Sequence, residues 1–348
     1  MLSNYWRVTL SNNITLLADG REELIDDLVM PSGRPVLGWE RKPHGWCRGD
    51  ACIPAFRAAA AESPPAAGTA GPRIDLVAFA HLLGRQAVVD LEEGVVAVGE
   101  PAGLSVDEAP DFTLGDGFTL SGLRGTKVAL VFWASWCGCR YDLAAWDDLH
   151  RELREYGFGV VSVSLDRRAE DAEPWTKDLA HTTLVDTEGR VAELYNVINV
   201  PTVVWIDEDG RIARPQDTMT ATDTFRSMNG LSSEAATAAL RRWVRTGESG
   251  LSGQAVREHL RTPTDDERLA RLHGRIAAWL FHRGRTAAAG RHLAKAAELA
   301  PHDLSIRRGL MPLAGVDPFG DEYFRLREEL ERAGTSIYRP LPDWHGAD

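Results

Sequence analysis

The sequence predicts an α/β domain with a central mixed sheet flanked by helices, set between an N-terminal α+β domain and a C-terminal helical region. Two observations carry this expectation. Apolar strands and amphipathic helices alternate from about residue 104 to 247, and helical apolar spacing dominates beyond residue 250. A chain of 348 residues has room for about two domains of roughly 150 residues each, or for one with appendages. The predicted divisions are residues 1–100, 104–247 and 250–348.

The composition is that of an ordinary globular protein, with 44% apolar and 26% charged residues. The formal net charge of −12 argues against nucleic acid as a partner, because nucleic-acid binders carry basic patches, and against anionic membranes. No run approaches the roughly 20 apolar residues of a membrane-spanning helix. The sequence from Met1 to Val8 also lacks the pattern of a signal peptide. We therefore expect a cytoplasmic protein with neither a membrane nor a nucleic-acid partner.

The N-terminal domain is expected to consist of short elements. A helix is predicted over Ile74–Leu83, ending at Gly84, and the Gly-, Pro- and Trp-rich stretch Trp39–Cys52 is expected to be a loop. The segment Ala58–Pro72 is too rich in Ala, Pro and Gly to bury a face and is expected to be flexible. The predicted strands are Arg7–Leu10, Ile14–Leu17, Val88–Leu91 and Val95–Val98, of which the last two form a hairpin.

The middle domain opens with a continuous apolar run, Lys127–Trp133, as expected for a strand buried on both faces. An amphipathic helix follows over Cys139–Tyr156, because apolar residues recur there at spacings of three and four. The later predicted elements are a strand at Val160–Leu165, a helix at Ala169–Leu179, a helical turn at Val191–Tyr195, a hairpin of Thr202–Ile206 with Arg211–Ala213, and a helix at Glu234–Arg245.

The C-terminal region is predicted to be helical from Asp265 onward. Its apolar spacing matches one tetratricopeptide-type pair of antiparallel helices that turns at Gly284. The residues expected to pack that pair are Ile276, Leu280, Leu293 and Ala296. Stacked repeats usually need about three copies, so we expect a helical appendage that packs on the middle domain.

The chemistry of the chain is concentrated in Phe132–Arg140, which reads F-W-A-S-W-C-G-C-R. A buried strand ends there, and two cysteines stand where a helix is predicted to begin. The unsatisfied N–H groups and partial positive charge of a helix N-terminus favour thiolate over thiol. A thiolate can attack a disulfide, and a second nearby thiol can resolve the mixed disulfide. The pattern therefore indicates dithiol redox chemistry, with no cofactor required.

Several motifs in order resemble the TlpA/ResA-like branch of the thioredoxin fold, the redoxin or AhpC/TSA-type family. These are A-P-D-F-T-L from Ala109, L-S-G-L-R-G from Leu120, the cysteine motif itself, N-V-P-T from Asn199 and W-I-D-E-D-G from Trp205. The resemblance covers residues 104–247 and implies thiol–disulfide oxidoreductase activity. The partners it implies are a disulfide- or thiol-containing protein or small molecule and an electron-donor reductase.

By this resemblance Cys137 takes the role of the attacking cysteine, Cys139 that of the resolving cysteine, and Asp142 that of an acidic active-site residue. Val200 and Pro201 would form the family's cis-proline loop, which faces the cysteines and shapes the substrate groove. The sequence itself adds Trp136, whose indole next to the cysteines could serve as a substrate platform.

The cysteine motif departs from the family's C-x-x-C pattern, because only Gly138 separates the two cysteines. On a regular helix, positions i and i+2 point about 200° apart, so their sulfurs would not meet. A bond between them requires an irregular first turn, which a glycine permits. The resemblance therefore predicts the fold of this domain, but it does not predict the redox potential of its cysteine pair.

Other functions remain open at this stage. A thioredoxin fold can persist as a redox-silent interaction module, and two sulfurs separated by a glycine could hold a soft metal such as Cu(I). The second pair, Cys47 and Cys52, lies close to His44. The two could be reduced cysteines, a disulfide that exchanges with Cys137 and Cys139, or part of a metal site, although a zinc site usually has four ligands.

Overall fold

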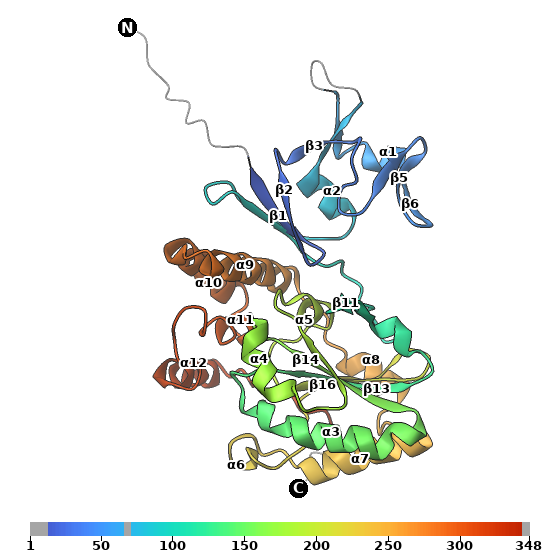
Figure 1. Cartoon of the computed structure of the whole chain (residues 1–348), viewed down its shortest axis with the longest axis vertical. Coiled ribbons are helices and arrows are strands. Elements are labelled where there is room, and N and C mark those ends of the chain that lie inside the picture. Colours follow the sequence, from blue (N-terminus) through green and yellow to red (C-terminus); the bar gives the residue numbers. More distant parts are fainter. Residues whose placement is uncertain (1–12, 66–70, 343–348) are drawn as a thin grey trace. The chain divides into compact units, whose positions relative to one another are not determined.

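The computed structural model describes residues 13–65 and 71–342, which fall into two compact units, residues 1–102 and 103–348 (Figure 1). The strand expected at Arg7–Leu10 lies outside the described residues. Residues 250–342 belong to the second unit, and the further division of that unit near residue 250 stays a prediction. Of the described helices, none is long and apolar enough to cross a membrane.

The first unit is built around a four-stranded sheet in the order β2-β1-β10-β9, in which β1 and β10 run parallel. The strands expected near Ile14, Val88 and Val95 are confirmed, as is the hairpin of the last two. These strands are β1 (Ile14–Ala18), β2 (Arg21–Ile25), β9 (Ala87–Asp90) and β10 (Val95–Val98). The expected helix is also confirmed as α2 (Leu76–Leu82); it begins after Asp75, whose side chain accepts the N–H of Ala78, and ends before Gly84.

The expectation of a loop over Trp39–Cys52 is wrong. The segment forms an antiparallel meander of β4 (Glu40–Lys42), β5 (Gly45–Arg48) and β6 (Ala51–Pro54). Each strand has only three or four residues, and tight turns at Pro43–His44 and Gly49–Asp50 separate them. The glycines and proline that suggest irregular backbone therefore lie largely in the turns of a sheet. A third small sheet consists of β3 (Val29–Pro31), β8 (Arg73–Asp75) and β7 (Glu62–Ser63), and a short helix α1 (Ala55–Ala58) follows β6.

The second unit has a five-stranded mixed sheet in the order β15-β14-β13-β16-β17, the topology of a thioredoxin-like fold (Figure 1). Strands β13, β14 and β15 are parallel to one another, β16 is antiparallel to β13, and β17 is antiparallel to β16. Their bounds are β13 (Lys127–Trp133), β14 (Phe158–Ser164), β15 (Thr182–Val185), β16 (Thr202–Ile206) and β17 (Ile212–Asp217). The predicted strand Lys127–Trp133 is confirmed at both ends. It lies at the centre of the sheet, where a strand that is apolar from Val128 onward is expected.

Helices cover both faces of this sheet and bury two apolar clusters. On one face, α3 and α7 pack Trp146 and Trp243 against Trp205 of β16. On the other face, α4, α5 and α8 pack against Leu130 and Phe132. The helices are α3 (Leu143–Leu153), α4 (Ala169–Thr176), α5 (Arg190–Leu194), α7 (Ser233–Thr246) and α8 (Gly253–His259), and two short β-strands, β11 (Thr113–Leu114) and β12 (Phe118–Thr119), precede the sheet. The sequence predicted each of these helices except α8.

The rest of the second unit is helical. The predicted pair is present as α9 (Asp265–His282) and α10 (Thr286–Leu299), with Gly284 in the left-handed conformation between them. The four residues expected to pack the pair are all buried or partly buried. Two further helices, α11 (Leu304–Arg307) and α12 (Asp321–Arg332), bring the chain back toward the sheet, and residues 337–341 run beside the end of β17.

Candidate functional site

Cys137 and Cys139 stand where β13 gives way to the helical segment that leads into α3. The segment starts as a 3₁₀ helix, η2 (Gly138–Asp142), and Cys137 is its N-cap residue with extended backbone angles. The backbone N–H of Cys139 donates to the Cys137 sulfur, at 3.2 Å between N and Sγ. Because Cys137 precedes the helix, the two cysteines are not held about 200° apart as positions i and i+2 of one regular helix would be. Both cysteines are free thiols and are 6% exposed.

Gly138 is needed at its position because of a close neighbour rather than a special backbone angle. A Cβ atom at Gly138 would lie 2.4 Å from the ring of Phe225, which is closer than real side chains approach one another. Phe225 directly precedes the short helix α6 (Arg226–Asn229). The aromatic ring therefore lies over the peptide that joins the two cysteines.

The loop expected to face the cysteines does so. The Cys137 thiol lies 3.6 Å from the Val200 carbonyl oxygen, and the Val200–Pro201 peptide bond is cis. Thr202 holds the loop by donating its hydroxyl to the Asn199 carbonyl, and the Asn199 amide donates to the Ile337 carbonyl. The structure thus brings Cys137, Cys139, Val200 and Pro201 together.

The two thiols differ in acidity. Burial opposes ionisation of Cys137, but a hydrogen bond from the Cys139 thiol, the positive charge of Arg308 and the backbone N–H of Cys139 together lower the pKa of Cys137 below its usual range. Burial and the hydrogen bond to the Cys137 sulfur raise the pKa of Cys139 well above that range. Cys137 is therefore the thiol poised to ionise, and Cys139 is the one that keeps its proton.

Arg308, which follows α11, is a site residue that the sequence did not indicate. Its guanidinium is buried over three aromatic rings, with its carbon 3.6 Å from the ring centre of Tyr323, 5.1 Å from Phe319 and 5.6 Å from Trp136. Its Nε donates to the Pro318 carbonyl. No carboxylate within the described ranges lies at ion-pair distance, so a Cys137 thiolate would supply compensating negative charge.

Trp136 is buried, and its indole is covered by the chain at Arg308 and Gly309. Its contact with a substrate stays a prediction.

The aromatic surface next to the cysteines comes instead from residues that the sequence did not single out. The Arg140 guanidinium stacks on the rings of Tyr141, Trp175 and Phe319, and Tyr141 also lies near Phe225. Tyr141 and Phe319 are exposed.

Asp142, at the end of η2, is buried beside the thiols. Its carboxylate accepts hydrogen bonds from the Thr222 hydroxyl and from the backbone N–H of Ala221. Burial outweighs these hydrogen bonds and raises the pKa of Asp142 from 3.8 to about 6. Its negative charge also raises the pKa of both cysteines. The group can therefore hold or release a proton near neutral pH, next to the dithiol.

The second cysteine pair, in the first unit, is a disulfide. Cys47 of β5 and Cys52 of β6 are directly opposite in the hairpin and are bonded to each other. His44 contacts both sulfurs, and the donor atoms of the three residues lie within 4.8 Å of one another. Within the described ranges this is the only group of three candidate ligands of this kind, and its two sulfurs are already joined. The disulfide is therefore favoured here over the metal-site and reduced-cysteine alternatives.

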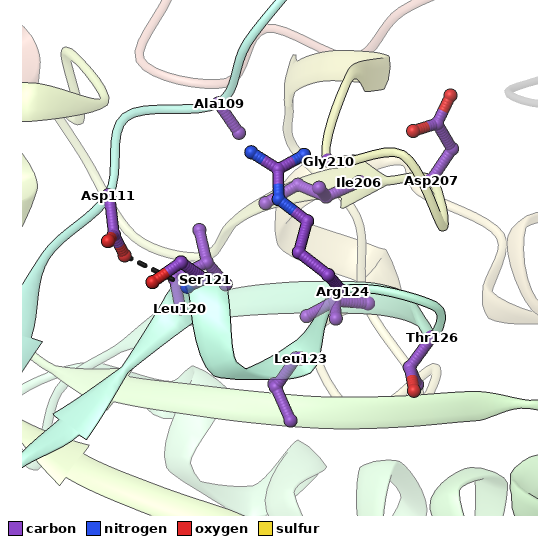
Figure 2. Close-up of a pocket in the computed structure, with 11 residues that line it drawn as sticks. Ala109, Asp111, Leu120, Ser121, Leu123, Arg124, Thr126, Ile206, Asp207 and Gly210 are labelled. Atoms are coloured by element: carbon purple, nitrogen blue, oxygen red, sulfur yellow. Dashed lines mark hydrogen bonds between the residues drawn. The ribbon is translucent and has the colours of Figure 1, made fainter.

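A pocket in the second unit is unrelated to the cysteines. Figure 2 shows it between the turn after β16 and the segment around Leu120, with Arg124 extending across it and Asp111 accepting the N–H of Ser121. A side chain at Gly210 would collide with the Arg124 guanidinium, which binds the Asp209 carbonyl. The residues that line the pocket include no cysteine or histidine, so we assign it no part in the chemistry.

Comparisons with known proteins found similar sequences and structures. Residues 106–214 match the AhpC/TSA family. The thioredoxin-like protein YneN of Bacillus subtilis is 36% identical over 132 residues, which are 35% of this chain and 74% of that protein. The thiol-disulfide oxidoreductase ResA of Oceanobacillus iheyensis is 36% identical over 117 residues, which are 30% of this chain and 61% of that protein. A crystal structure of a putative thiol:disulfide interchange protein DsbE from Chlorobium tepidum shares 36% identity with a TM-score of 0.30, covering 31% of this chain and 82% of that one.

Proposed function

The chain belongs to the AhpC/TSA family, and we propose that it is a thiol–disulfide oxidoreductase that works through the dithiol of Cys137 and Cys139. The assignment of the two roles depends on one observation: the pKa of Cys137 is lowered, whereas the pKa of the neighbouring Cys139 is raised. A lowered pKa supplies the nucleophile, and a raised pKa keeps the second thiol protonated until it is needed. In this proposal Cys137 attacks and Cys139 resolves.

The reaction runs as two exchanges. The Cys137 thiolate attacks one sulfur of the substrate disulfide, a mixed disulfide forms, and the other substrate sulfur leaves and takes up a proton. The Cys139 thiol then loses its proton and attacks the Cys137 sulfur, which releases the substrate as a dithiol. Two electrons pass from the protein to the substrate, and the protein is left with a Cys137–Cys139 disulfide. A reductase that supplies two electrons and two protons restores the dithiol.

Two charged residues assist this cycle. Arg308 stabilises the Cys137 thiolate from its buried position over Trp136. Asp142 accepts the Cys139 proton, which its pKa of about 6 suits it to do near neutral pH. The Val200 carbonyl, beside the Cys137 sulfur, gives an extended substrate chain a main-chain acceptor next to the reacting atom.

The substrates that fit this site are proteins that carry a disulfide, or the thiols that the reverse reaction oxidises. The exposed rings of Tyr141 and Phe319, grouped around Arg140, offer apolar surface to a peptide beside the dithiol.

We assign α9 and α10 to a single tetratricopeptide-type pair, from which the chain leads to Arg308. We also propose that the protein works in the cytoplasm and, because its net charge is −12, without association with anionic membranes. Cell fractionation with thiol trapping at harvest tests this placement.

A direct test uses a peptide with a single disulfide as oxidant and the pre-reduced full chain as reductant. Peptide thiols and Cys137–Cys139 disulfide should appear in equal amounts, because each exchange oxidises one dithiol. Tryptic mapping identifies the bridge, since Cys137 and Cys139 share one peptide that ends at Arg140. Peptide reduction without oxidation of that pair would refute the proposal. No reduction at all would instead favour a redox-silent interaction module.

A further inference from the structure

The Cys47–Cys52 disulfide lies in a setting built by the turn that precedes it. His44 occupies the turn between β4 and β5, and its carbonyl accepts the N–H of Ala55 at 3.0 Å. Gly45 follows with a positive φ, and a Cβ atom there would lie 1.9 Å from the Ile53 carbonyl oxygen, so only glycine fits. These contacts fix the backbone of the turn from which the His44 imidazole extends to the bridge.

The imidazole contacts both sulfurs through one nitrogen. His44 Nε2 lies 3.3 Å from the Cys47 sulfur and 3.6 Å from the Cys52 sulfur. The two cysteines differ in access, since Cys47 is 2% exposed whereas Cys52 and His44 are exposed. A thiolate from solution can therefore reach the Cys52 sulfur, and the sulfur that would leave is the buried one, nearest to the imidazole.

A purely stabilising role accounts poorly for this bridge. The two cysteines are five positions apart in strands that already pair from Gly45 to Arg48. In the chain-entropy account, a cross-link stabilises a protein less as the loop that it closes becomes shorter. The apolar cluster beneath the hairpin also includes Trp46, whose indole N–H donates to Glu62 at 3.0 Å. The unit thus has other contacts that hold the hairpin in place.

We propose that Cys47 and Cys52 form a second redox-active site, which a dithiol reductant opens by attacking Cys52 while His44 protonates the departing Cys47 sulfur. In the first step the reductant thiolate bonds to the Cys52 sulfur, the bond between Cys47 and Cys52 breaks, and the proton passes from His44 Nε2 to Cys47. The second thiol of the reductant then attacks the reductant sulfur of this mixed disulfide. The bond to Cys52 breaks and Cys52 takes up the proton of that thiol, so the reductant ends as a disulfide and the hairpin as a dithiol. Two electrons enter the hairpin, and solvent restores the imidazole proton.

The test follows this pair alone in the folded full-length protein, with dithiothreitol as the reductant. Timed samples are quenched with an alkylating reagent and mapped after trypsin digestion, which cuts after Arg48 and so places Cys47 and Cys52 on separate peptides. Because dithiothreitol reacts from solution, the result does not depend on Cys137 and Cys139. We expect His44→Gln to slow reduction at least about tenfold. The matched control His81→Gln, an exposed histidine of the same unit, should leave the rate unchanged.

A second measurement separates the two sulfurs. With oxidised glutathione, the Cys47→Ser variant should form a mixed disulfide at Cys52 much faster than the Cys52→Ser variant forms one at Cys47. A bridge that opens only in denaturant would overturn the proposal, as would equal reduction rates in wild type and His44→Gln. Equal reactivity of the two single cysteines would contradict attack at Cys52. Because mapping of the wild-type protein needs no cysteine variant, a poorly folded variant would not leave the proposal undecided.

Discussion

The backbone N–H of Cys139 donates to the sulfur of Cys137, with 3.2 Å between N and Sγ. The partially positive hydrogen of this N–H points at the sulfur that is proposed to attack, and the Cys139 thiol donates a second hydrogen bond to it. The hydrogen bond between the two thiols favours the Cys137 thiolate and at the same time raises the pKa of Cys139. The two cysteines therefore differ in role because of this one hydrogen bond.

The first prediction concerns these two sulfurs. Cys137→Ser should abolish disulfide reduction, because the attacking thiolate is lost. Cys139→Ser should still attack and should accumulate a mixed disulfide with the substrate, because resolution is lost. Mass spectrometry of the non-reduced protein after mixing with a disulfide peptide detects the adduct. Equal activity of wild type and both variants would contradict the dithiol mechanism.

The second prediction concerns Arg308. Arg308→Gln removes the positive charge that favours the Cys137 thiolate and should therefore raise the pKa of Cys137. The rate of Cys137 alkylation by iodoacetamide, measured against pH, reports that pKa directly. Arg308→Lys keeps a positive charge and should shift the profile less. If Arg308→Gln and wild type share one alkylation midpoint, the charge of Arg308 does not act on Cys137.

The third prediction follows from the pKa of Asp142, which is raised from 3.8 to about 6. The folded protein then holds this proton up to a higher pH than the unfolded chain does, so the free energy of unfolding falls as pH rises from about 4 to about 6 and levels off above. The loss due to this one group is on the order of 2–3 kcal/mol. Asp142→Asn removes it and should be more stable than wild type at pH 7.5, with the advantage shrinking toward pH 4.

Urea unfolding of both proteins at several pH values measures this difference, in which the contributions of all other titrating groups cancel. A difference between Asp142→Asn and wild type that stays constant from pH 4 to pH 7.5 would show that Asp142 titrates normally.

The sequence was most informative where one local pattern determines structure. The run Lys127–Trp133, which is apolar after its first residue, predicted a central strand, and the alternating helices predicted the covering of its two faces. The cysteine motif could be located in the same way, because it follows that strand directly. The meander over Trp39–Cys52 was not predicted, because β4 is entirely exposed and polar and therefore shows no alternation of apolar and polar residues.

The residues that complete the site could not be predicted from the sequence, for a different reason. Arg308 is 171 positions after Cys137 in the chain, and no local pattern around it suggests redox chemistry. It acts only because the chain returns after α10 and packs Gly309 against Trp136. Phe225 likewise reaches Gly138 through tertiary contact alone. Such residues become recognisable only when the fold places them beside the motif.

The last prediction tests that contact. In Gly138→Ala the new methyl group would lie 2.4 Å from the Phe225 ring, so the ring or the cysteine turn must move. Overpacking of this kind typically costs about 1–3 kcal/mol, and we expect kcat/KM for disulfide reduction to fall about tenfold as the turn shifts. Gly253→Ala is a matched control, since Gly253 also opens a helix but has no atom within 4 Å of an added Cβ. Its activity should equal that of wild type.

Removing the Phe225 ring should relieve the clash, so adding Gly138→Ala to Phe225→Ala should change kcat/KM little. A full tenfold loss in that background as well would mean that the glycine is required for its own backbone freedom rather than for the approach of Phe225.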